Sequence, residues 1–528
     1  MISKKYISKI IALSLIMFAS VLVGCSDDST KSNTTSDSDN SGGQLKVALE
    51  SQPNTLDPLM SSAVVRARVA QNIFESLVTL NSDFEPTPML AESIEQSEDG
   101  LTYTFHLRKG VNFHNGKEMT AEDVLASMNR WAEKSTQALA YFEGITFEME
   151  DDYTVIMKLK EKYKDILVFL AERDDSSIMP KEVIESEETT GVTEYIGTGP
   201  FKFDDWKQDQ YIKLSKFEDY TQSDLPTDGL SGKKEALVDD LYFYFVTDTS
   251  TRLMGLKTGE YDIVNFLPED NYEELKSDPN INTLISYKGA IEISFNKKEG
   301  LFSDFKMREA VNTAVDAEMI MKSTYPDEDL YKLNPGYIND QIVNWYVDAG
   351  KEKYNQGDPE KARELLEEAG YDGEEITVLS TRDYDYNYNT AVILQQQLEE
   401  AGMNVKIEIY DWSSLLDLQH DPGVWDISIL GPDYKTSPPQ MLALDPKWPG
   451  WTDDPKITDL KDKIRTAETQ EQAKAHWETL QEFLWTEYLP ISRVGDYAVI
   501  VGTTDKVEGF KVFDSPGGYI FWNTKVSE

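Results

Sequence analysis

The segment covering residues 90–130 constrains the fold most, because signals for a strand, a tight turn and a helix follow one another within it. Residues 101–107 alternate apolar and polar side chains, which is the period of a half-buried strand. The alternation resumes at residues 111–113 and predicts a second short strand. The dipeptide Asn115-Gly116 then favours a tight turn, since both residues adopt positive φ angles at low cost.

A helix is expected to follow this turn. Thr120 stands at the position of an N-cap, and Asp123, three residues later, can complete a capping box. Apolar residues that would face a core then recur at helical spacing, at Val124, Leu125, Met128 and Trp131. Each of these features has a structural purpose, and none of them requires catalysis.

The phrase EDGLTYTFHLRKGVNFHNGKEMTAEDV, which covers most of this segment, resembles the hallmark segment of family 5 extracellular solute-binding proteins. Members of that family are the oligopeptide, dipeptide and nickel receptors of ABC importers. The phrases GTGPF, from Gly197, and TRLMGLKTGEYDIV, from Thr251, are also similar to the family. The resemblance covers roughly residues 45–524. It implies an α/β fold of the two-lobed type II (cluster C) periplasmic-binding-protein-like class, with an additional inserted domain and with ligand between the lobes.

The length of 528 residues is too great for a single hydrophobic core, and the resemblance implies three domains. We expect a discontinuous first lobe made of residues 44–79, 197–287 and 501–528. Residues 80–196 would form the inserted domain, and residues 288–500 would form the second lobe.

Outside residues 90–130, the apolar pattern predicts a mixture of strands and helices. From Asp358 onward strand and helix alternate, and the strands are nearly continuous apolar runs, which indicates an α/β sheet with right-handed crossovers. Asp358, Pro359 and Gly370 mark the two ends of one of these helices. The clearest patterns predict helices at 64–80, 390–401, 457–467 and 471–488, and strands at 45–49, 291–295, 376–379, 405–409 and 427–430.

The first 24 residues have the pattern of a lipoprotein signal peptide. Three lysines precede an apolar run at residues 10–23, which is too short to span a membrane comfortably as a mature helix. The run ends in Leu-Val-Gly-Cys, which is similar to the lipobox cut before a lipidated cysteine. Cys25 is the only cysteine, so disulfides are excluded, and lipidation is favoured over a buried free thiol. Residues 25–43 lack large apolar side chains and are expected to form a disordered tether.

The charge balance excludes some classes of partner. The chain has 51 Lys and Arg residues against 95 Asp and Glu residues, a formal charge of -44, which repels nucleic acid and anionic lipid. A cationic or zwitterionic ligand is compatible with this charge, although the same charge also serves solubility alone. We expect no nucleic-acid partner and a monomeric protein.

No cofactor, metal or catalytic site is predicted. Gly197 and Gly199 begin a dinucleotide-like pattern, but Lys202 stands where the third glycine is required. The four histidines are scattered, and neither an HExxH motif nor paired cysteines accompany them. No G-x-S-x-G, Ser-x-x-Lys or Cys/His arrangement is evident, so we expect a binding protein rather than an enzyme.

Two charged residues are the strongest candidates for ligand recognition. Asp433 follows the apolar strand at 427–430, at the carboxyl end where open α/β sheets bind ligands. The residues alone favour a structural Gly-Pro-Asp turn, but the resemblance implies that Asp433 holds the α-ammonium group of a peptide. Arg382, just past the strand at 376–379, is similar to the arginine with which dipeptide receptors grip the peptide carboxylate, with an exposed loop arginine as the alternative.

Aromatic residues of the same lobe are further candidates. Tyr384 and Trp425 would supply walls that accept varied side chains or stack on sugars, and a core or rim position is the alternative for both.

We therefore expect a substrate-binding lipoprotein of an ABC importer, which captures an oligopeptide or dipeptide and delivers it to the permease. It would act outside the cytoplasm, anchored through lipid on Cys25 to the outer face of a Gram-positive membrane or within a periplasm. Nickel-chelate and oligosaccharide receptors of the same family are alternatives within the binding class. A secreted hydrolase on this fold, and a surface adhesin or chemoreceptor partner, are alternatives from other classes.

Overall fold

The computed structural model describes residues 42–172, 174–514 and 518–527. The predicted signal peptide at 1–24, the lipidation site at Cys25 and all but the end of the predicted tether at 25–43 lie outside the described residues. Among the helices of the described part, none has the length and apolarity needed to cross a membrane.

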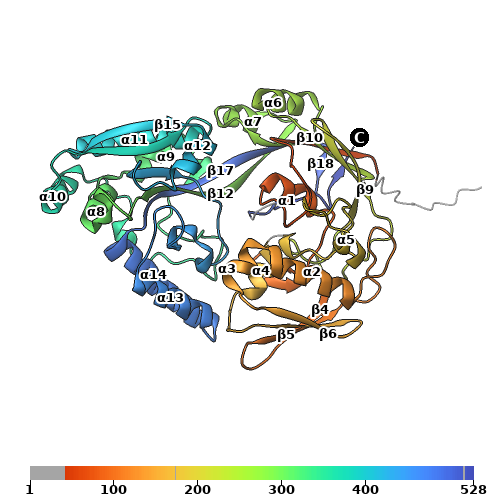
Figure 1. The fold of residues 1–528 in the computed structure, drawn as a ribbon. Coiled ribbons are helices and arrows are strands. Elements are labelled where there is room, and N and C mark those ends of the chain that lie inside the picture. Colours follow the sequence, from red (N-terminus) through yellow and green to blue (C-terminus); the bar gives the residue numbers. More distant parts are fainter. Residues whose placement is uncertain (1–41, 173, 515–517, 528) are drawn as a thin grey trace, which may run out of the picture. The chain divides into compact units, whose positions relative to one another are not determined.

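Most strands in this described part belong to one mixed sheet of eleven strands (Figure 1). In order along the sheet they are β15 (Asn404–Tyr410), β14 (Glu375–Thr381), β16 (Ile427–Leu430), β12 (Ile281–Phe295), β17 (Ile491–Thr504), β11 (Ile263–Leu267), β1 (Gln44–Leu49), β10 (Asp240–Phe245), β9 (Tyr211–Lys216) and β8 (Phe201–Lys207), and β13 (Tyr331–Lys332) pairs with β17. Strand β14 runs parallel to β15 and β16, and β1 runs parallel to β10 and β11. The other pairs are antiparallel. The α/β fold class and the five predicted strands are confirmed.

Two long strands, β12 and β17, run side by side through the middle of this sheet (Figure 1). They pair from Ile281 opposite Thr504 to Ser294 opposite Ile491, with register shifts after Tyr287 and Ile291. On its other edge β12 hydrogen-bonds β16, while β17 hydrogen-bonds β11. The pair therefore joins the strands of the N-terminal and C-terminal segments into one sheet. The predicted strand at 291–295 is only the last third of β12.

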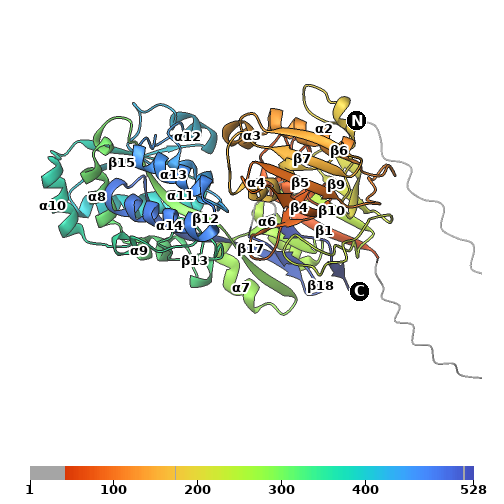
Figure 2. The same cartoon turned by 90° about the horizontal axis from the view of Figure 1, so that it is seen from below.

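A second sheet of four strands lies within the region predicted as the inserted domain (Figures 1 and 2). Its order is β4 (Ala91–Gln96), β5 (Thr102–Leu107), β7 (Thr154–Lys158) and β6 (Thr146–Asp151). Helix α2 (Ala121–Lys134) packs against β6, β7 and α3 (Thr136–Tyr141), while α4 (Ile166–Glu172) lies against β2 (Val78–Leu80) and β3 (Pro86–Pro88). Val124, Met128 and Trp131 are buried and Leu125 is half-buried, which confirms the predicted core face of α2.

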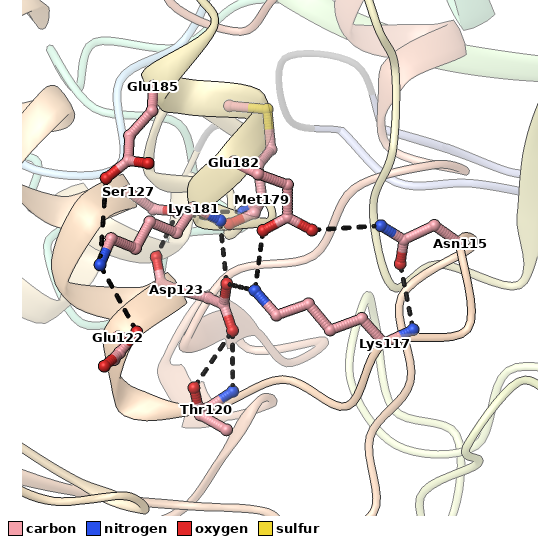
Figure 3. Close-up of polar contacts among 10 residues, drawn as sticks. All are labelled: Asn115, Lys117, Thr120, Glu122, Asp123, Ser127, Met179, Lys181, Glu182 and Glu185. Carbon is pink, nitrogen blue, oxygen red and sulfur yellow. Dashed lines mark hydrogen bonds and ion pairs between the residues drawn. The ribbon is translucent and has the colours of Figure 1, made fainter.

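Asp123 ties the start of α2 to a distant part of the chain (Figure 3). Its Oδ2 accepts a hydrogen bond from the Thr120 backbone N–H at 3.1 Å and from the Thr120 hydroxyl at 3.3 Å, which confirms the predicted capping interaction. Its Oδ1 accepts from the Lys117 Nζ at 2.6 Å and from the Lys181 N–H at 2.9 Å, where α5 (Lys181–Glu185) begins. Because Asp123 is fully buried, these donors are what make its charge tolerable.

The predicted second strand at residues 111–113 is wrong. The Phe113 N–H donates to the Lys117 carbonyl at 2.8 Å, and an isolated bridge between Asn112 and Glu118 takes the place of a ladder. The segment is therefore a closed turn around Gly116, whose φ of 82° is the positive backbone angle for which the Asn-Gly dipeptide is suited.

His114 fastens this turn to the glycine-rich phrase. The Gly197 N–H donates to His114 Nδ1 at 3.2 Å, and His114 Nε2 lies 3.0 Å from the Gly199 carbonyl. With Nδ1 accepting, Nε2 carries the proton and donates, which is the pattern of a neutral imidazole. Burial lowers the pKa of His114 to about 4, so the ring stays neutral at physiological pH.

The predicted helix at 64–80 is wrong beyond its first two turns. Helix α1 (Val64–Ala70) ends where the Asn72 side chain donates to the carbonyls of Arg68 at 2.9 Å and Val69 at 3.2 Å. The Ile73 carbonyl then accepts from the Gly199 N–H at 2.8 Å. Pairing with the glycine-rich phrase thus replaces the helical hydrogen bonds that the apolar spacing predicted.

The predicted helices of the C-terminal half form with small changes of boundary. They are α10 (Pro359–Ala369), α11 (Asp385–Glu400), α13 (Pro455–Thr466) and α14 (Gln470–Phe483), the last extended by a π-helical turn (Leu484–Tyr488). Asp358 caps α10 by accepting from the Lys361 N–H, Pro359 opens the helix and Gly370 ends it, as predicted.

The division into lobes and an inserted domain stays a prediction. The other elements are α6 (Thr249–Thr258), α7 (Tyr272–Ser277), α8 (Phe305–Ala314), α9 (Ala317–Thr324), α12 (Trp412–Leu418) and the short strands β18 (Val507–Glu508), β19 (Lys511–Val512), β20 (Tyr519–Ile520) and β21 (Lys525–Val526).

Candidate functional site

The loop that leaves the carboxyl end of β16 is fixed against β12. The Ala290 N–H donates to the Pro432 carbonyl at 3.2 Å, and Gly289 and Asp433 form an isolated bridge. A Cβ on Gly289 would lie 2.0 Å from the Pro432 carbonyl oxygen, so this approach requires glycine. The backbone of Asp433 is therefore held firmly, whereas its carboxylate receives no hydrogen bond from the described residues.

Asp433 lines a small cavity of about 90 Å³, which we call the charged cavity. Residues from separate elements meet there: Glu50 follows β1, Arg68 belongs to α1, and Lys288 belongs to β12. Asp514, which precedes β20, is the remaining acidic residue of the lining. Two cations and three carboxylates therefore face one small space.

Arg68 and Glu50 form a closed unit in the wall of the charged cavity. The Arg68 Nη1 lies 2.7 Å from Glu50 Oε1, and the Arg68 guanidinium lies 4.7 Å from the ring centre of Tyr519. Asn265 donates to Glu50 Oε2 at 3.0 Å, and the Tyr519 hydroxyl donates to Asn265. Burial acts to raise the pKa of Glu50, but the charge of Arg68 and these hydrogen bonds outweigh it and lower the pKa. This pair is already neutralised within the protein.

Lys288 has no such partner. Its ammonium lies 4.9 Å from the ring centre of Tyr519, and none of the described residues forms an ion pair with it. Burial, followed by repulsion from Arg68, lowers the pKa of Lys288 to about 8, against the attraction of Asp514 and Asp433. A desolvated ammonium gains most from an anion that a ligand supplies. The charged cavity therefore offers a cation, Lys288, and a carboxylate, Asp433, that are both open to a ligand carrying both signs of charge.

Asp433 and Tyr434 also line a second cavity of about 480 Å³, which we call the large cavity. This volume lies in the range of small-molecule sites. Its walls are mainly apolar and aromatic, and they include Leu416, Leu430, Trp412, Met441 and Trp448. Its charged lining residues besides Asp433 are Glu292, Lys435 and Arg493.

Arg493 is engaged by other protein groups. It forms an ion pair with Asp496, its Nε donates to the Asn334 carbonyl at 3.2 Å, and its Nη1 donates to the Tyr337 carbonyl at 3.2 Å. Because all three nitrogens of the guanidinium are engaged, Arg493 shapes the wall of the large cavity rather than offering a free anion site.

The other residues predicted for the site line neither of these two cavities. Arg382 is exposed, donates to the Tyr388 hydroxyl at 3.0 Å and lies 4.4 Å from the ring centre of Tyr388, and it lines neither cavity. Tyr384 is 43% exposed and meets Trp412 edge to face at 5.1 Å, at the border of the large cavity.

Trp425 is buried in a small apolar cluster with Leu379 and Leu415, and its indole N–H donates to the Gln419 carbonyl at 3.1 Å. It lines neither cavity. The structure thus places Asp433 in the lining of both cavities and places Arg382, Tyr384 and Trp425 in neither, although Tyr384 contacts Trp412 in the wall of the large cavity.

Sequence reasoning missed Arg68, Lys288 and Glu292. Arg68 stands among apolar positions of a predicted helix face and is 1% exposed, so a charge within an otherwise apolar stripe is the signal that could have found it. Lys288 lies on the part of β12 that was not predicted as a strand, whereas Glu292 lies within the predicted strand at 291–295 as a charged residue among apolar ones. Within the described ranges no group of three or more His, Cys, Asp or Glu residues is arranged to hold a metal ion.

Comparisons with known proteins agree with this architecture. A sequence profile described as "Bacterial extracellular solute-binding proteins, family 5 Middle" matches residues 85–449. Over 480 residues the chain is 28% identical to a probable peptide ABC transporter periplasmic-binding protein of Sinorhizobium fredii, covering 86% of this chain and 88% of the relative.

Two solved structures are similar in fold and in sequence. The periplasmic binding protein DppA of Helicobacter pylori, in complex with the peptide STSA, has a TM-score of 0.75 and 26% identity, covering 92% of this chain and 98% of that chain. The periplasmic binding protein AgaA of A. tumefaciens R10, in complex with agropinic acid, has a TM-score of 0.75 and 26% identity, covering 92% and 99%. These likenesses confirm the two-lobed, periplasmic-binding-protein-like fold class. Because the family profile spans more than half of the sequence, the chain belongs to the bacterial extracellular solute-binding proteins, family 5.

Proposed function

We propose that this protein captures a small peptide with a free amino terminus and delivers it to the permease of an ABC importer. The observation that carries the proposal is the pair of unpartnered opposite charges in the charged cavity, Asp433 and Lys288. A zwitterion bound there would satisfy both groups at once. Membership of a family of extracellular solute-binding proteins supports the same role, as does similarity to a probable peptide ABC transporter protein.

In this proposal Asp433 accepts the α-ammonium group of the peptide. A half-buried carboxylate on a rigid backbone is a favourable partner for an ammonium group, because little conformational freedom is lost on binding. Lys288, with the Arg68–Glu50 pair behind it, would take a carboxylate or a carbonyl oxygen of the ligand. Arg382 stays a candidate for the far end of a longer peptide.

A second candidate ligand class is a small opine-like anion, which one observation favours. The similar protein from A. tumefaciens is in complex with agropinic acid, and Lys288 would suit the anionic group of such a ligand. Nickel chelates and oligosaccharides are the remaining alternatives. All of these are binding functions, and we propose that the ligand leaves chemically unchanged.

The proposal is tested first by a thermal-shift screen. Peptides, opines, nickel–histidine chelates and oligosaccharides are each added at millimolar concentration, and the true ligand class raises the melting temperature. A screen in which peptides produce no shift while another class does would replace the peptide assignment. Recovery of intact peptide by mass spectrometry after long incubation separates binding from hydrolysis.

Calorimetry of the best peptide then tests Asp433. Asp433→Asn is expected to weaken binding at least tenfold, because a desolvated ammonium would lose its charged partner. Asp417→Asn, an exposed site on α12, is the matched control and is expected to bind as the wild type does. Equal affinity of the two variants would remove Asp433 from the binding site.

We also propose that the mature protein is a monomer anchored by lipid on Cys25, with the predicted tether between anchor and fold. The lipobox-like sequence supports this anchor. Expression of the full precursor should place the protein in the detergent phase of a phase-separation assay, and Cys25→Ser should move it to the aqueous phase. Aqueous partition of the unaltered protein would contradict the anchor, and light scattering measures the oligomeric state.

A further inference from the structure

A buried carboxylate without a partner faces the large cavity. Glu292 belongs to β12, is 6% exposed and lines the cavity, and its carboxylate takes part in no hydrogen bond or ion pair with the described residues. Its neighbours in the sheet register are Leu430 of β16 and Arg493 of β17. Leucine offers no polar group, and Arg493 is already engaged by Asp496 and by two carbonyls.

Such a buried, unpaired carboxylate is costly for the folded protein. Buried carboxylates are nearly always paired or hydrogen-bonded, because an isolated charge loses its hydration without compensation. Burial raises the pKa of Glu292 to about 7, although Arg493 and Lys435 act to lower it, while Asp496 adds to the rise. A group kept in such a state, and facing a space large enough for a ligand, is suited to receive its partner from that ligand.

The other walls of the large cavity indicate the chemical class of the ligand group that would pair with Glu292. Trp412, Trp448 and Met441 surround the space with apolar and aromatic surface. Such walls suit the aliphatic stem of a long side chain whose charged end reaches further in. Asp433 lines both cavities, so a ligand with its amino group at Asp433 can extend into the large cavity.

We propose that the large cavity is a subsite for a cationic side chain, with Glu292 as its ionic partner, so that the preferred ligands are peptides containing lysine or arginine. This inference rests on the proposed peptide-binding function and adds the class of side chain. A lysine or arginine stem would lie against the tryptophans, and its charged end would meet the Glu292 carboxylate.

The charged and titratable groups around Glu292 predict how pH affects this selectivity. Arg493 and Asp496 face it from β17, Lys435 and Asp433 from the loop after β16, and Tyr337 also lines the cavity. Ionised Glu292 attracts the cationic side chain, and protonated Glu292 does not. Preference for a basic side chain should therefore be strong at pH 8 and decline as the pH falls to 5.5.

Calorimetry with matched tripeptides tests the inference. Lysine is placed at each of the three positions of an alanine tripeptide, and each peptide is paired with one in which norleucine replaces the lysine. At pH 8 we expect at least one position to favour lysine over norleucine by tenfold or more. Glu292→Gln should abolish this preference while binding the norleucine peptide within about threefold of the wild type.

A second measurement needs no variant. In the wild-type protein the ratio of the affinity for the lysine peptide to that for the norleucine peptide should fall at least threefold between pH 8 and pH 5.5. Titration of Lys288 affects both peptides alike, so its effect cancels in this ratio. Binding of every peptide without preference for lysine would overturn the subsite and leave the peptide-binding function standing. A lysine preference that Glu292→Gln retains would also overturn it. Failure of all six peptides to bind would overturn both proposals.

Discussion

Replacing Arg130 with methionine should destabilise the protein by about 3 kcal/mol, because the change removes the cationic partner of a buried carboxylate, Asp57, which keeps only its backbone N–H donors. Arg130, near the end of α2, is 4% exposed. Its Nη1 and Nη2 lie 3.1 and 2.6 Å from the two Asp57 carboxylate oxygens, and its Nε lies 3.0 Å from Glu187 Oε2. The guanidinium thus joins α2 to the loop that contains Asp57 and to the loop that contains Glu187, both distant from α2 in sequence.

The magnitude follows from what each carboxylate retains in Arg130→Met. Asp57, which is fully buried, keeps the N–H groups of Leu59 at 3.0 Å and Val192 at 2.7 Å. Glu187 keeps its ion pair with Lys134 at 2.5 Å. Breaking a buried pair costs about 3–5 kcal/mol when a charge is left uncompensated. The remaining donors place the expected loss at the lower end of that range.

Urea unfolding followed by tryptophan fluorescence measures this loss. The matched control is Lys158→Met, which removes a 2.6 Å ion pair with Glu148 whose two side chains are about half exposed, and it should cost less than about 1 kcal/mol. Adding Asp57→Asn to Arg130→Met should restore at least half of the lost stability, since no buried charge is then left behind. Equal effects of Arg130→Met and Lys158→Met, or no recovery in the double variant, would refute this reasoning.

Three further predictions concern the same region and use the same unfolding assay. The wild type should lose up to about 3 kcal/mol of stability as the pH falls from about 6.5 to 4, because His114 binds a proton in the unfolded chain and not in the folded protein. His114→Asn should flatten this dependence of stability on pH, and an unchanged slope would contradict the role given to His114. Gly197→Ala should cost about 2 kcal/mol or more, since a Cβ there would lie 2.1 Å from the Ile73 carbonyl oxygen, while Gly423→Ala, whose nearest neighbour is at 3.4 Å, should be nearly neutral. Asp123→Asn should cost about 1–3 kcal/mol because Lys117 loses its buried anionic partner, and a loss below about 0.5 kcal/mol would contradict a stabilising role of this ion pair.

Features set by a few neighbouring residues were predictable from the sequence. The ends of α10, marked by Asp358, Pro359 and Gly370, form as predicted because each cap depends on residues within one helical turn. The interaction between Thr120 and Asp123 is equally local. The sequence does not reveal that Asp123 also binds Lys181, because that contact depends on the fold.

Features set by distant partners were not predictable in the same way. The apolar spacing at 64–80 fits a helix, but the Ile73 backbone pairs instead with Gly199, more than a hundred residues away. Strand β12 extends far beyond its apolar end because β17 supplies hydrogen bonds along nearly all of its length. Local periodicity carries no information on either partner.

The candidate site was predictable in part. Asp433 could be singled out because the end of an apolar strand and the family resemblance both point to it. Lys288 and Glu292 are charged residues of a strand, and from the sequence alone such residues are expected to face solvent. The role of Lys288 arises only when the end of β1, α1 and the loop after β16 come together at the charged cavity. The role of Glu292 arises only when α12, β17 and the loop after β16 enclose the large cavity.

The central claim is that the site recognises a free amino group, and one comparison tests it most directly. The peptide with the largest thermal shift is titrated into the wild-type protein by calorimetry, with its N-acetylated form as the only other ligand. Acetylation removes the positive charge and leaves Asp433 without its partner, so the account predicts at least tenfold weaker binding, or about 1.4 kcal/mol. Equal affinity for the two peptides would contradict it.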